Sequence, residues 1–352
     1  MTNSTPAAIE TRLLPQSEKM PLPSPLFPEA GFAALDSWMF LMGKMYRFPV
    51  YRIVALAGGN VEGILSLVHV KHGLFGNYLV TSPYASYGGF SFLSIQARDA
   101  LLAHAQKLGD ELDVEYINVR FLDGSLTPPA GWTQHPVYAT YRARLNPDIE
   151  SLLASYSPNH RNHVRKSLKK GFRVRFGGME LLDDAYEGLA RSMHELGSPY
   201  HAKSYLRGIV SALGADVELA ALYDARGCLS GAGVFIFSGV TATNLHANIL
   251  RQARPDYGGE FLYWSAITRY AQRGFETFDM GRSLIGSGNE VFKMKWNPER
   301  KILAYWYYLR KTPAAPNLNQ KNPKFRLAIW AWRRMPAFAV RLAGPALICG
   351  LA

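Results

Sequence analysis

Residues 257–280 read YGGEFLYWSAITRYAQRGFETFDM, and this stretch decides the fold that the sequence predicts. A tyrosine and two glycines open an apolar helix to about residue 272, and residues 277–280 are typical of a short closing strand. The same order occurs earlier, where Tyr87, Gly88 and Gly89 precede a helix at residues 95–108 and a strand at 116–120. An arrangement that appears twice predicts two domains of one kind.

Both copies have the same elements before this helix. Each begins with helical segments and continues with predicted strands around a turn that contains glycine. The helical segments are residues 28–46 in the first copy and 181–196 and 203–213 in the second; the strands are 50–56, 63–70 and 78–81, and 218–223, 231–237 and 243–248. This order predicts an α+β protein with two mixed, mostly antiparallel sheets, each flanked by helices.

The domain boundaries follow from the composition. We expect a flexible leader rich in Pro, Ser and Thr at residues 1–25, a first domain at 26–150 and a second at 151–312. A basic, aromatic tail should occupy 313–352. With 352 residues, of which 48% are hydrophobic, the chain can bury two cores.

Targeting and redox signals favour the cytoplasm. Cys228 and Cys349 offer no disulfide framework, which fits a reducing compartment. No apolar run resembles a secretion signal or a transmembrane helix. We therefore expect a cytoplasmic protein, either free or at the inner face of the membrane.

The positive charge of the chain, +12 in total, is concentrated in two segments. Residues 151–179 contain seven Lys and Arg and no acid, and residues 300–352 contain ten and no acid. Such segments indicate two surfaces that meet anionic partners. Nucleic acid, phosphorylated small molecules such as coenzyme A, and an anionic membrane remain open as partners.

The first basic segment predicts a capped helix. Ser157 suits the N-cap, Pro158 the first helical position and Gly171 the end. Three cations recur every four residues and should share one face: Arg161, Arg165 and Lys169. This face is either the phosphate-facing wall of a substrate groove or an ordinary solvated surface.

The segment after residue 279 holds most of the candidate site residues. Asp279 and Arg282 flank the end of an apolar strand, and a glycine-rich loop that includes Ser283 follows. Residues 292–296, FKMKW, alternate as a strand would, with Lys293 and Lys295 on one face and Trp296 on the other. The alternative is an exposed strand with surface lysines.

A candidate phosphate site precedes the helix quoted above. Small residues at a helix N-terminus expose unpaired N–H groups to a pyrophosphate or phosphate. The candidates are Arg254, Tyr257, Gly258 and Gly259. The alternative is a simple capping turn.

Other catalytic patterns are absent from the sequence. His160 and His163 lie three apart on the basic helix, but no Cys, Asp or Glu accompanies them, so we expect no metal site. There is neither a Gly-x-Ser-x-Gly nucleophile turn nor a Walker phosphate loop.

The tail from residue 324 to 352 mixes aromatic and basic residues and predicts one or two short helices broken by Pro336 and Pro345. Either these helices rest on anionic lipid as a peripheral contact, or they pack on the second domain.

Four of these segments, in this order, resemble the FemAB-type proteins. They are SPNHRNHVRKSLKKG (157–171), HELGSPYHAKSYLRGIV (194–210), FETFDMGRSLIGSGNEVFKMKW (275–296) and PNLNQKNPKFRLAIWAWRRMP (316–336). The subgroup that accompanies exosortase and PEP-CTERM exopolysaccharide systems is the most similar. The resemblance implies two tandem domains of the GNAT acetyltransferase fold. Characterised FemAB-type proteins move an aminoacyl group from aminoacyl-tRNA to an amine of a peptidoglycan precursor.

The resemblance also implies roles for particular residues. Lys293 matches the lysine that steadies the tetrahedral oxyanion, and Asp279 is either the general base or a residue that orients Lys293 or Arg282. The basic helix, Arg282, Ser283, Lys295 and Trp296 would contact substrate.

The implied activity is N-acyl transfer without a tightly bound cofactor, onto an amine of an anionic or lipid-linked precursor of the cell envelope or an exopolysaccharide. Acyl-CoA and aminoacyl-tRNA are both open as co-substrates. The spacing around Gly258 departs from the usual coenzyme A pattern, and the long helical arm of several tRNA-using relatives is missing, which disfavours tRNA. The alternative function is a non-catalytic GNAT-fold protein that docks anionic polymer, lipid or RNA.

Overall fold

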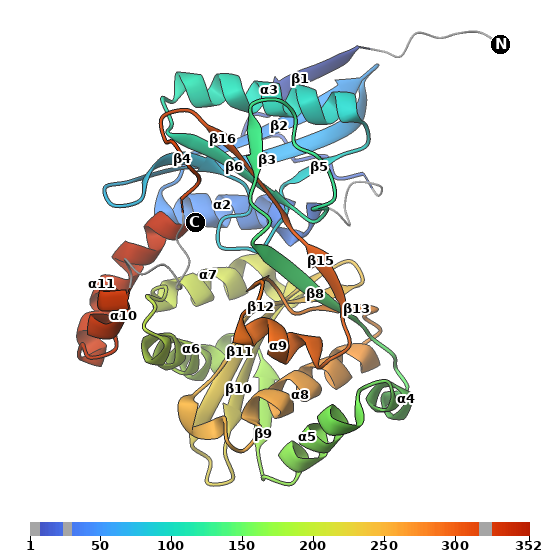
Figure 1. Cartoon of the computed structure of the whole chain (residues 1–352), viewed down its shortest axis with the longest axis vertical. Coiled ribbons are helices and arrows are strands. Elements are labelled where there is room, and N and C mark those ends of the chain that lie inside the picture. The colour runs from blue at the N-terminus through green and yellow to red at the C-terminus, as the bar shows by residue number, and fades with distance from the viewer. Residues whose placement is uncertain (1–7, 24–29, 317–325) are drawn as a thin grey trace, which may run out of the picture. The chain divides into compact units, whose positions relative to one another are not determined.

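The computed structural model describes residues 8–23, 30–316 and 326–352. These residues form two compact units, each with its own sheet (Figure 1). Of the described residues, unit 1 comprises 8–23, 30–137, 302–315 and 350–352, and unit 2 comprises 138–301, 316 and 326–349. Each unit is described by itself.

The sheet of unit 1 has the order β1-β2-β3-β4-β6-β16-β7, with β5 paired to β3. Neighbouring strands are antiparallel, except that β4 and β6 are parallel. The strands are β1 (Ile9–Leu13), β2 (Val50–Ala57), β3 (Asn60–His72), β4 (Gly76–Val80), β5 (Phe90–Phe92), β6 (Tyr116–Phe121), β7 (Trp132–Gln134) and β16 (Ala304–Leu309).

Two helices cover this sheet because β2 and β3 are apolar on both faces. Ile53 and Leu65 lie in the cluster that α3 (Ile95–Glu111) covers, whereas their neighbours Val54 and Ile64 lie in a separate cluster. The helix α2 (Asp36–Tyr46) follows the short helix η1 (Phe32–Ala34) and also contacts β2 and β3. Alternation along a strand places successive residues on opposite faces, which explains the two clusters.

The sheet of unit 2 has the order β14-β8-β13-β12-β11-β10-β9, with β15 paired to β8. Its strands are β8 (Tyr138–Arg144), β9 (Arg173–Gly177), β10 (Val217–Tyr223), β11 (Leu229–Ser238), β12 (Thr241–Ile249), β13 (Thr277–Asp279), β14 (Ser283–Leu284) and β15 (Glu299–Ile302). Its helices are α4 (Ile149–Ala154), α5 (Pro158–Leu168), α6 (Leu182–Leu196), α7 (Lys203–Leu213), α8 (Gly258–Gln272), α9 (Gly288–Met294), α10 (Arg326–Trp332) and α11 (Ala337–Ile348), with short helices η2 (Met179–Leu181), η3 (Gly214–Asp216) and η4 (Arg251–Ala253). The last short helix, η6 (Cys349–Leu351), begins in unit 2 and ends in unit 1.

Helices lie on both faces of the second sheet. Phe235 and Phe237 of β11 pack in the aromatic cluster to which α8 contributes Leu262. On the other face, Gly188 of α6 lies so close to Ala232 that an added Cβ would come within 2.8 Å of the alanine Cβ. A glycine at this point of α6 therefore permits the close helix–sheet approach.

The strands β12 and β13 are parallel and pair only briefly. Thr241, Ala242 and Thr243 pair with residues 277–279, but β12 continues to Ile249 after β13 has ended. The two strands therefore separate beyond Thr243 and Asp279, and α8 starts shortly after the free end of β12.

The structure corrects two boundaries predicted from the sequence. The expectation of a flexible leader at residues 1–25 is wrong for Ile9–Leu13, which forms β1 along the edge of β2. Residues 1–7, 24 and 25 of that leader lie outside the described residues. The second domain does not begin at residue 151 and run without interruption to 312. Instead β8 already belongs to the second sheet, whereas β16 pairs with β6 in the first. Pairings between distant strands depend on the tertiary fold, and local sequence patterns do not specify them.

The tail helices α10 and α11 pack on unit 2, whereas residues 350–352 belong to unit 1. Trp332 and Val340 are buried, and Arg341 pairs with Glu187 of α6 at 2.6 Å. At Gly344 an added Cβ would lie 2.9 Å from the Tyr200 carbonyl oxygen. The predicted short helices are present as α10 and α11, although Pro345 lies inside α11 and does not end it. Among the described helices, none has both the length and the apolar character needed to cross a bilayer.

Candidate active site

The basic helix is the first component of the candidate site. The Ser157 side chain accepts a hydrogen bond from the His160 amide at 3.3 Å, Pro158 is the first helical residue and Gly171 is left-handed, with φ 74°, so the predicted start and end of α5 are confirmed. Arg165 and Lys169 are exposed. Arg161 instead donates to the Ala154 carbonyl at 2.9 Å and so joins α5 to the end of α4.

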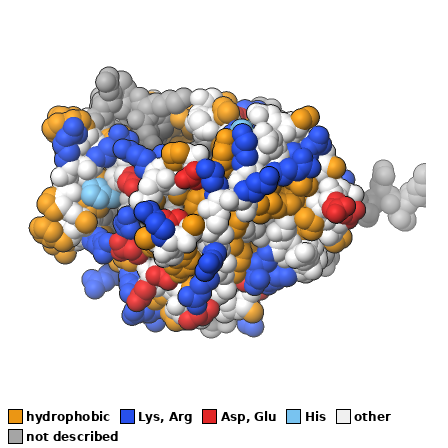
Figure 2. All heavy atoms as spheres, turned by 90° about the horizontal axis from the view of Figure 1, so that it is seen from below, with side chains coloured by type: hydrophobic (Ala, Val, Ile, Leu, Met, Phe, Trp, Pro, Cys, Tyr) orange, Lys and Arg blue, Asp and Glu red, His pale blue; other side chains and the backbone are white. Residues whose placement is uncertain are grey.

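On the face of the molecule that Figure 2 shows, Lys and Arg side chains are interspersed with acidic and hydrophobic ones. Lys170 is paired with Asp256 at 2.6 Å. Fewer cations are therefore free to meet an anionic ligand than the composition of the segment indicates.

The N-terminus of α8 is the second component. Tyr257 is the N-cap in a left-handed conformation, with φ 62°, and its side chain makes no capping hydrogen bond. Gly258 is buried so tightly that an added Cβ would lie 2.9 Å from the Ala253 carbonyl oxygen, whereas Gly259 has room for one. Arg254 is exposed and makes only a long 3.5 Å hydrogen bond to Ile249. The predicted helix start is confirmed, and in the part of the chain that the structure describes the N-cap side chain leaves the first amides of α8 uncapped.

The two components lie side by side because α5 packs on α8. His163 of α5 stacks near Tyr257, with ring centroids 4.9 Å apart. Lys166 of α5 lies over the same tyrosine ring at 6.0 Å. The basic helix and the phosphate-site candidates therefore belong to one location, although they are almost a hundred residues apart.

The third component is α9, and here the predicted secondary structure is wrong. Residues 292–296 are not a strand that carries Lys293 and Lys295 on one face, since α9 runs to Met294 and Lys295 is its C-cap. The cause is a pair of capping hydrogen bonds close to a capping box, with the sequence Ser-x-x-Glu and with the Glu290 carboxylate on the amide before the N-cap. Ser287 accepts a hydrogen bond from the Glu290 amide, while the Glu290 carboxylate accepts one from the Gly286 amide.

Lys293 is held with its ammonium group inside unit 2. The side chain is 7% exposed, and its Nζ donates to the carbonyl oxygens of Gly281 at 2.8 Å and Arg282 at 3.0 Å. Burial lowers the pKa of Lys293 to about 7; the negative charge of Asp279 opposes this shift and the positive charge of Arg282 adds to it. Two of its three N–H donors are used on carbonyls, which leaves one for a further acceptor.

Asp279 anchors the loop that holds Lys293. This fully buried carboxylate accepts hydrogen bonds from Thr140 Oγ1 at 2.6 Å and from the Gly281 amide at 2.8 Å. Arg282 is exposed, with its guanidinium 5.1 Å from the centre of the Tyr138 ring. Ser283 is buried in β14, and its Oγ has no hydrogen-bond partner among the described residues. These contacts favour the orienting role of Asp279.

Lys295 and Trp296 extend the site from α9 toward α5 and α8. Lys295 pairs with Glu260 of α8 at 3.6 Å. Trp296 is 1% exposed, and its ring lies edge-on to the His160 ring with centroids 4.3 Å apart. Trp296 is therefore part of the core beneath the site, and its Nε1 has no hydrogen-bond partner among the described residues.

Two functional candidates were missed by the sequence argument. Asn244 lies immediately after the point where β12 and β13 separate, and its Nδ2 donates to the Tyr263 hydroxyl at 2.8 Å while its Oδ1 lacks a partner among the described residues. Glu260, one residue after Gly259, is buried beside His160 and His163. The expectation that no carboxylate joins these histidines is therefore wrong. Both candidates are polar residues within a strand or helix that also carries apolar residues, and this pattern is the signal by which the sequence could have indicated them.

Comparison with known proteins identifies the fold. The family model "Acetyltransferase (GNAT) domain" matches residues 158–294, which lie in unit 2. The crystal structure of FemX is 15% identical, with a TM-score of 0.63 over 82% of this chain and 94% of that chain. A tandem GNAT protein from the clavulanic acid biosynthesis pathway is 14% identical, with a TM-score of 0.53 over 87% of this chain and 100% of that one. L-PGS from Bacillus licheniformis is 14% identical, with a TM-score of 0.51 over 80% and 86%. No curated protein matches the sequence.

These likenesses confirm the two tandem α+β domains predicted from the repeat and the GNAT fold implied by the resemblance, and the match to the family model spans the candidate site of unit 2. The matched residues begin at Pro158 and end at Met294, so they contain α5, the start of α8 and Lys293.

Proposed function

We propose that unit 2 is an N-acyltransferase that moves an acyl or aminoacyl group from an activated donor to an amine, with the ammonium group of Lys293 stabilising the oxyanion. The observation that carries this proposal is the geometry of Lys293. Its buried Nζ is fixed by two backbone carbonyls at the end of β13 and retains one N–H donor. A preorganised donor in a site of low polarity acts more strongly on developing charge than it would in water.

The donor would bind at the N-terminus of α8. The amides of Gly258 and Gly259 lie in the first turn of the helix, where unpaired N–H groups and the helix dipole favour an anion. The neighbour of Lys293, Phe292, is 3.5 Å from the position of an added Cβ at Gly259. Phe292 and Lys293, which are adjacent in α9, therefore link the proposed donor site at Gly259 to the proposed oxyanion site.

Two donor classes can be compared with this arrangement. Acyl-CoA carries a pyrophosphate that the α8 N-terminus would hold, and the exposed cations Arg165 and Lys169 extend a positive surface along α5. Aminoacyl-tRNA would need a longer positive surface, whereas on the face that Figure 2 shows, Lys and Arg side chains are interspersed with acidic and hydrophobic ones. We propose acyl-CoA as the first donor to test.

The acceptor that we propose is an amine of a cell-envelope or exopolysaccharide precursor, in keeping with the resemblance to the exosortase-associated FemAB subgroup. The described tail adds a reason to look for lipid-linked acceptors. Large apolar side chains are exposed along α10 and α11, namely Leu327, Trp330, Phe338 and Leu342. An exposed apolar row on short helices fits contact with the interfacial region of a bilayer.

The test is turnover with a panel of acyl-CoA donors and aminoacyl-tRNA, measured with and without amine acceptors. We expect Lys293→Ala to lower turnover by about two orders of magnitude, the usual effect of removing one oxyanion donor. Lys301→Ala, which removes a lysine of β15 outside the site, is the matched control and should retain wild-type activity. Equal turnover of wild type and Lys293→Ala would refute the role of Lys293. A lack of turnover by wild type over the whole panel, with salt-sensitive binding of anionic polymer, would favour a non-catalytic binding protein.

A further inference from the structure

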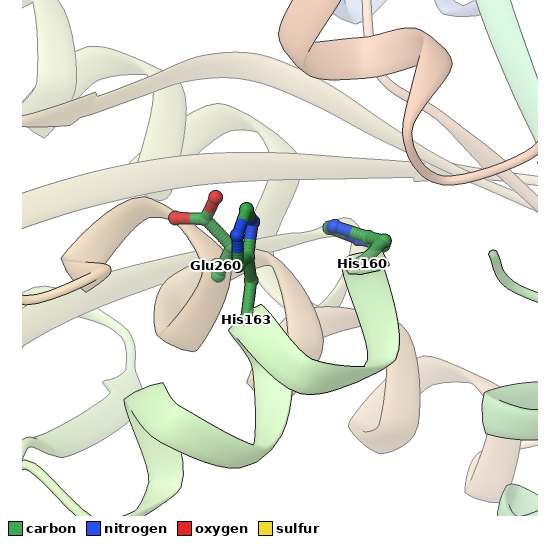
Figure 3. Close-up of side chains that lie close together, drawn as sticks. All are labelled: His160, His163 and Glu260. Carbon is green, nitrogen blue, oxygen red and sulfur yellow. The ribbon is translucent and has the colours of Figure 1, made fainter. Parts of the chain in front are cut away.

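Two helices of unit 2 bring two imidazoles and a carboxylate together. His160 and His163 are one turn apart on α5, and Glu260 is in the first turn of α8. Figure 3 shows the ring of His163 beside the Glu260 carboxylate, with the ring of His160 pointing toward them. One possible ligand atom from each residue lies within 4.8 Å of those of the other two.

The burial of the histidines leaves their polar atoms without partners. His160 is 1% exposed, and neither of its ring nitrogens has a hydrogen-bond partner among the described residues; the same holds for the buried Nδ1 of His163. Leaving a buried polar group unpaired costs about 1–3 kcal/mol. Three such atoms beside a buried carboxylate therefore indicate a missing ligand.

We propose that His160, His163 and Glu260 bind a divalent transition-metal ion, with Zn²⁺ as the best match. Two imidazoles and one carboxylate are a ligand set that zinc uses in sites that keep one position open. Atoms bound to zinc at about 2 Å in a tetrahedral site lie about 3.3 Å apart, so rotamer changes on the order of 1 Å would close the present spacing.

Lys295 is the group that opposes the ion. Its Nζ is 3.6 Å from Glu260 Oε1, so its positive charge competes with a cation for the same carboxylate. A chain without this lysine charge should therefore bind the ion more tightly. Tighter binding of the ion without the lysine charge would distinguish a metal site from a cluster of side chains that is only part of the packed core. This comparison does not depend on acyl-transfer activity.

The test uses the full chain, freed of metal by a chelator and titrated with Zn²⁺ by calorimetry, with bound zinc counted by elemental analysis. We expect one ion per chain. His163→Gln and Glu260→Gln should each weaken binding at least 100-fold, whereas His135→Gln, in unit 1, should bind as wild type does. Lys295→Met should bind more tightly than wild type. Co²⁺ should give the intense visible absorption of a tetrahedral site in wild type and in Lys295→Met.

Two results would overturn the proposal. One is a wild-type chain that takes up no stoichiometric zinc and gives no tetrahedral Co²⁺ spectrum. The other is unchanged zinc affinity in both His163→Gln and Glu260→Gln. If these variants fail to fold, the zinc affinity of Lys295→Met decides the question. A zinc affinity equal to or weaker than that of wild type would contradict a site at Glu260.

Discussion

The burial of Lys293 predicts a pH-dependent stability that can be measured without a substrate. The pKa of its ammonium group falls from 10.5 to about 7 in the folded chain. One pKa unit corresponds to about 1.4 kcal/mol, so the whole depression corresponds to about 5 kcal/mol. Between pH 7 and 10.5 the unfolded state binds a proton that the folded state does not, so Lys293 makes stability increase with pH across that interval.

The perturbation is Lys293→Met, which removes the titrating group and keeps an unbranched apolar side chain. The free energy of unfolding of wild type should increase relative to that of the variant by about 2–3 kcal/mol between pH 7 and pH 9. The two curves should run parallel below about pH 6, where lysine is protonated in both the folded and unfolded states.

Urea unfolding read by pulsed hydrogen exchange and mass spectrometry of residues 281–296 gives the stability of this region separately from that of unit 1. Lys71→Met, at an exposed position of β3, is the matched control, and its difference from wild type should stay constant with pH. A wild-type curve that stays parallel to that of Lys293→Met from pH 6 to pH 9 would refute the reasoning.

Three further predictions concern the donor site, the protonation of Lys293 and the tail. Gly258→Ala should destabilise unit 2 by about 1–3 kcal/mol, because the new Cβ would lie 2.9 Å from the Ala253 carbonyl oxygen, whereas Gly259→Ala should leave the stability almost unchanged. Equal shifts of the melting temperature in the two variants would contradict this. For hydrolysis of the donor in the absence of an amine, kcat/KM should fall as pH rises through about 7, because stabilisation of the oxyanion needs the protonated Lys293. A rise of kcat/KM with the same pKa would instead indicate that Lys293 acts as a base. Replacing Trp330, Phe338 and Leu342 by Ala should reduce binding to vesicles that contain anionic lipid, measured by flotation, with Val291→Ala on α9 as the control; undiminished binding would exclude the tail as the contact.

Local signals in the sequence are sufficient to predict most of the helices and strands, because helix caps and glycines determine the backbone conformation over only a few residues. Ser157, Pro158 and Gly171 correctly delimit α5, and the two glycines after Tyr257 correctly mark the start of α8. The error at residues 292–296 came from giving more weight to a five-residue alternation than to the capping sequence Ser287-x-x-Glu290, which was present in the sequence. Five residues are too few to separate the two periods.

The candidate site was only partly predictable for a different reason. Lys293 and the α8 N-terminus could be singled out, but the contact of α5 with α8 is a tertiary feature. No local pattern therefore indicates that Glu260 lies beside His160 and His163. Nor does the sequence indicate that Arg161 donates a hydrogen bond to the Ala154 carbonyl, or that Lys170 forms an ion pair with Asp256.

The tail illustrates the same limit. Its composition left membrane contact and packing on unit 2 as alternatives, and the structure shows packing through Trp332, Val340 and Arg341. The exposed row of apolar side chains is compatible with both, because the buried and exposed residues lie on different sides of α10 and α11. Of the arginines described there, Arg333 donates to the Leu196 carbonyl and Arg341 pairs with Glu187, so charge contributes less to a membrane contact than the sequence indicated.

The most direct test of the central claim is a crystal structure of the full chain with a non-hydrolysable acyl-CoA analogue. The account predicts that the pyrophosphate lies on the amides of Gly258 and Gly259, and that the oxygen replacing the acyl carbonyl lies within hydrogen-bond distance of Lys293 Nζ. An analogue bound in unit 2 with its acyl group away from Lys293, or bound only to unit 1, would contradict the account.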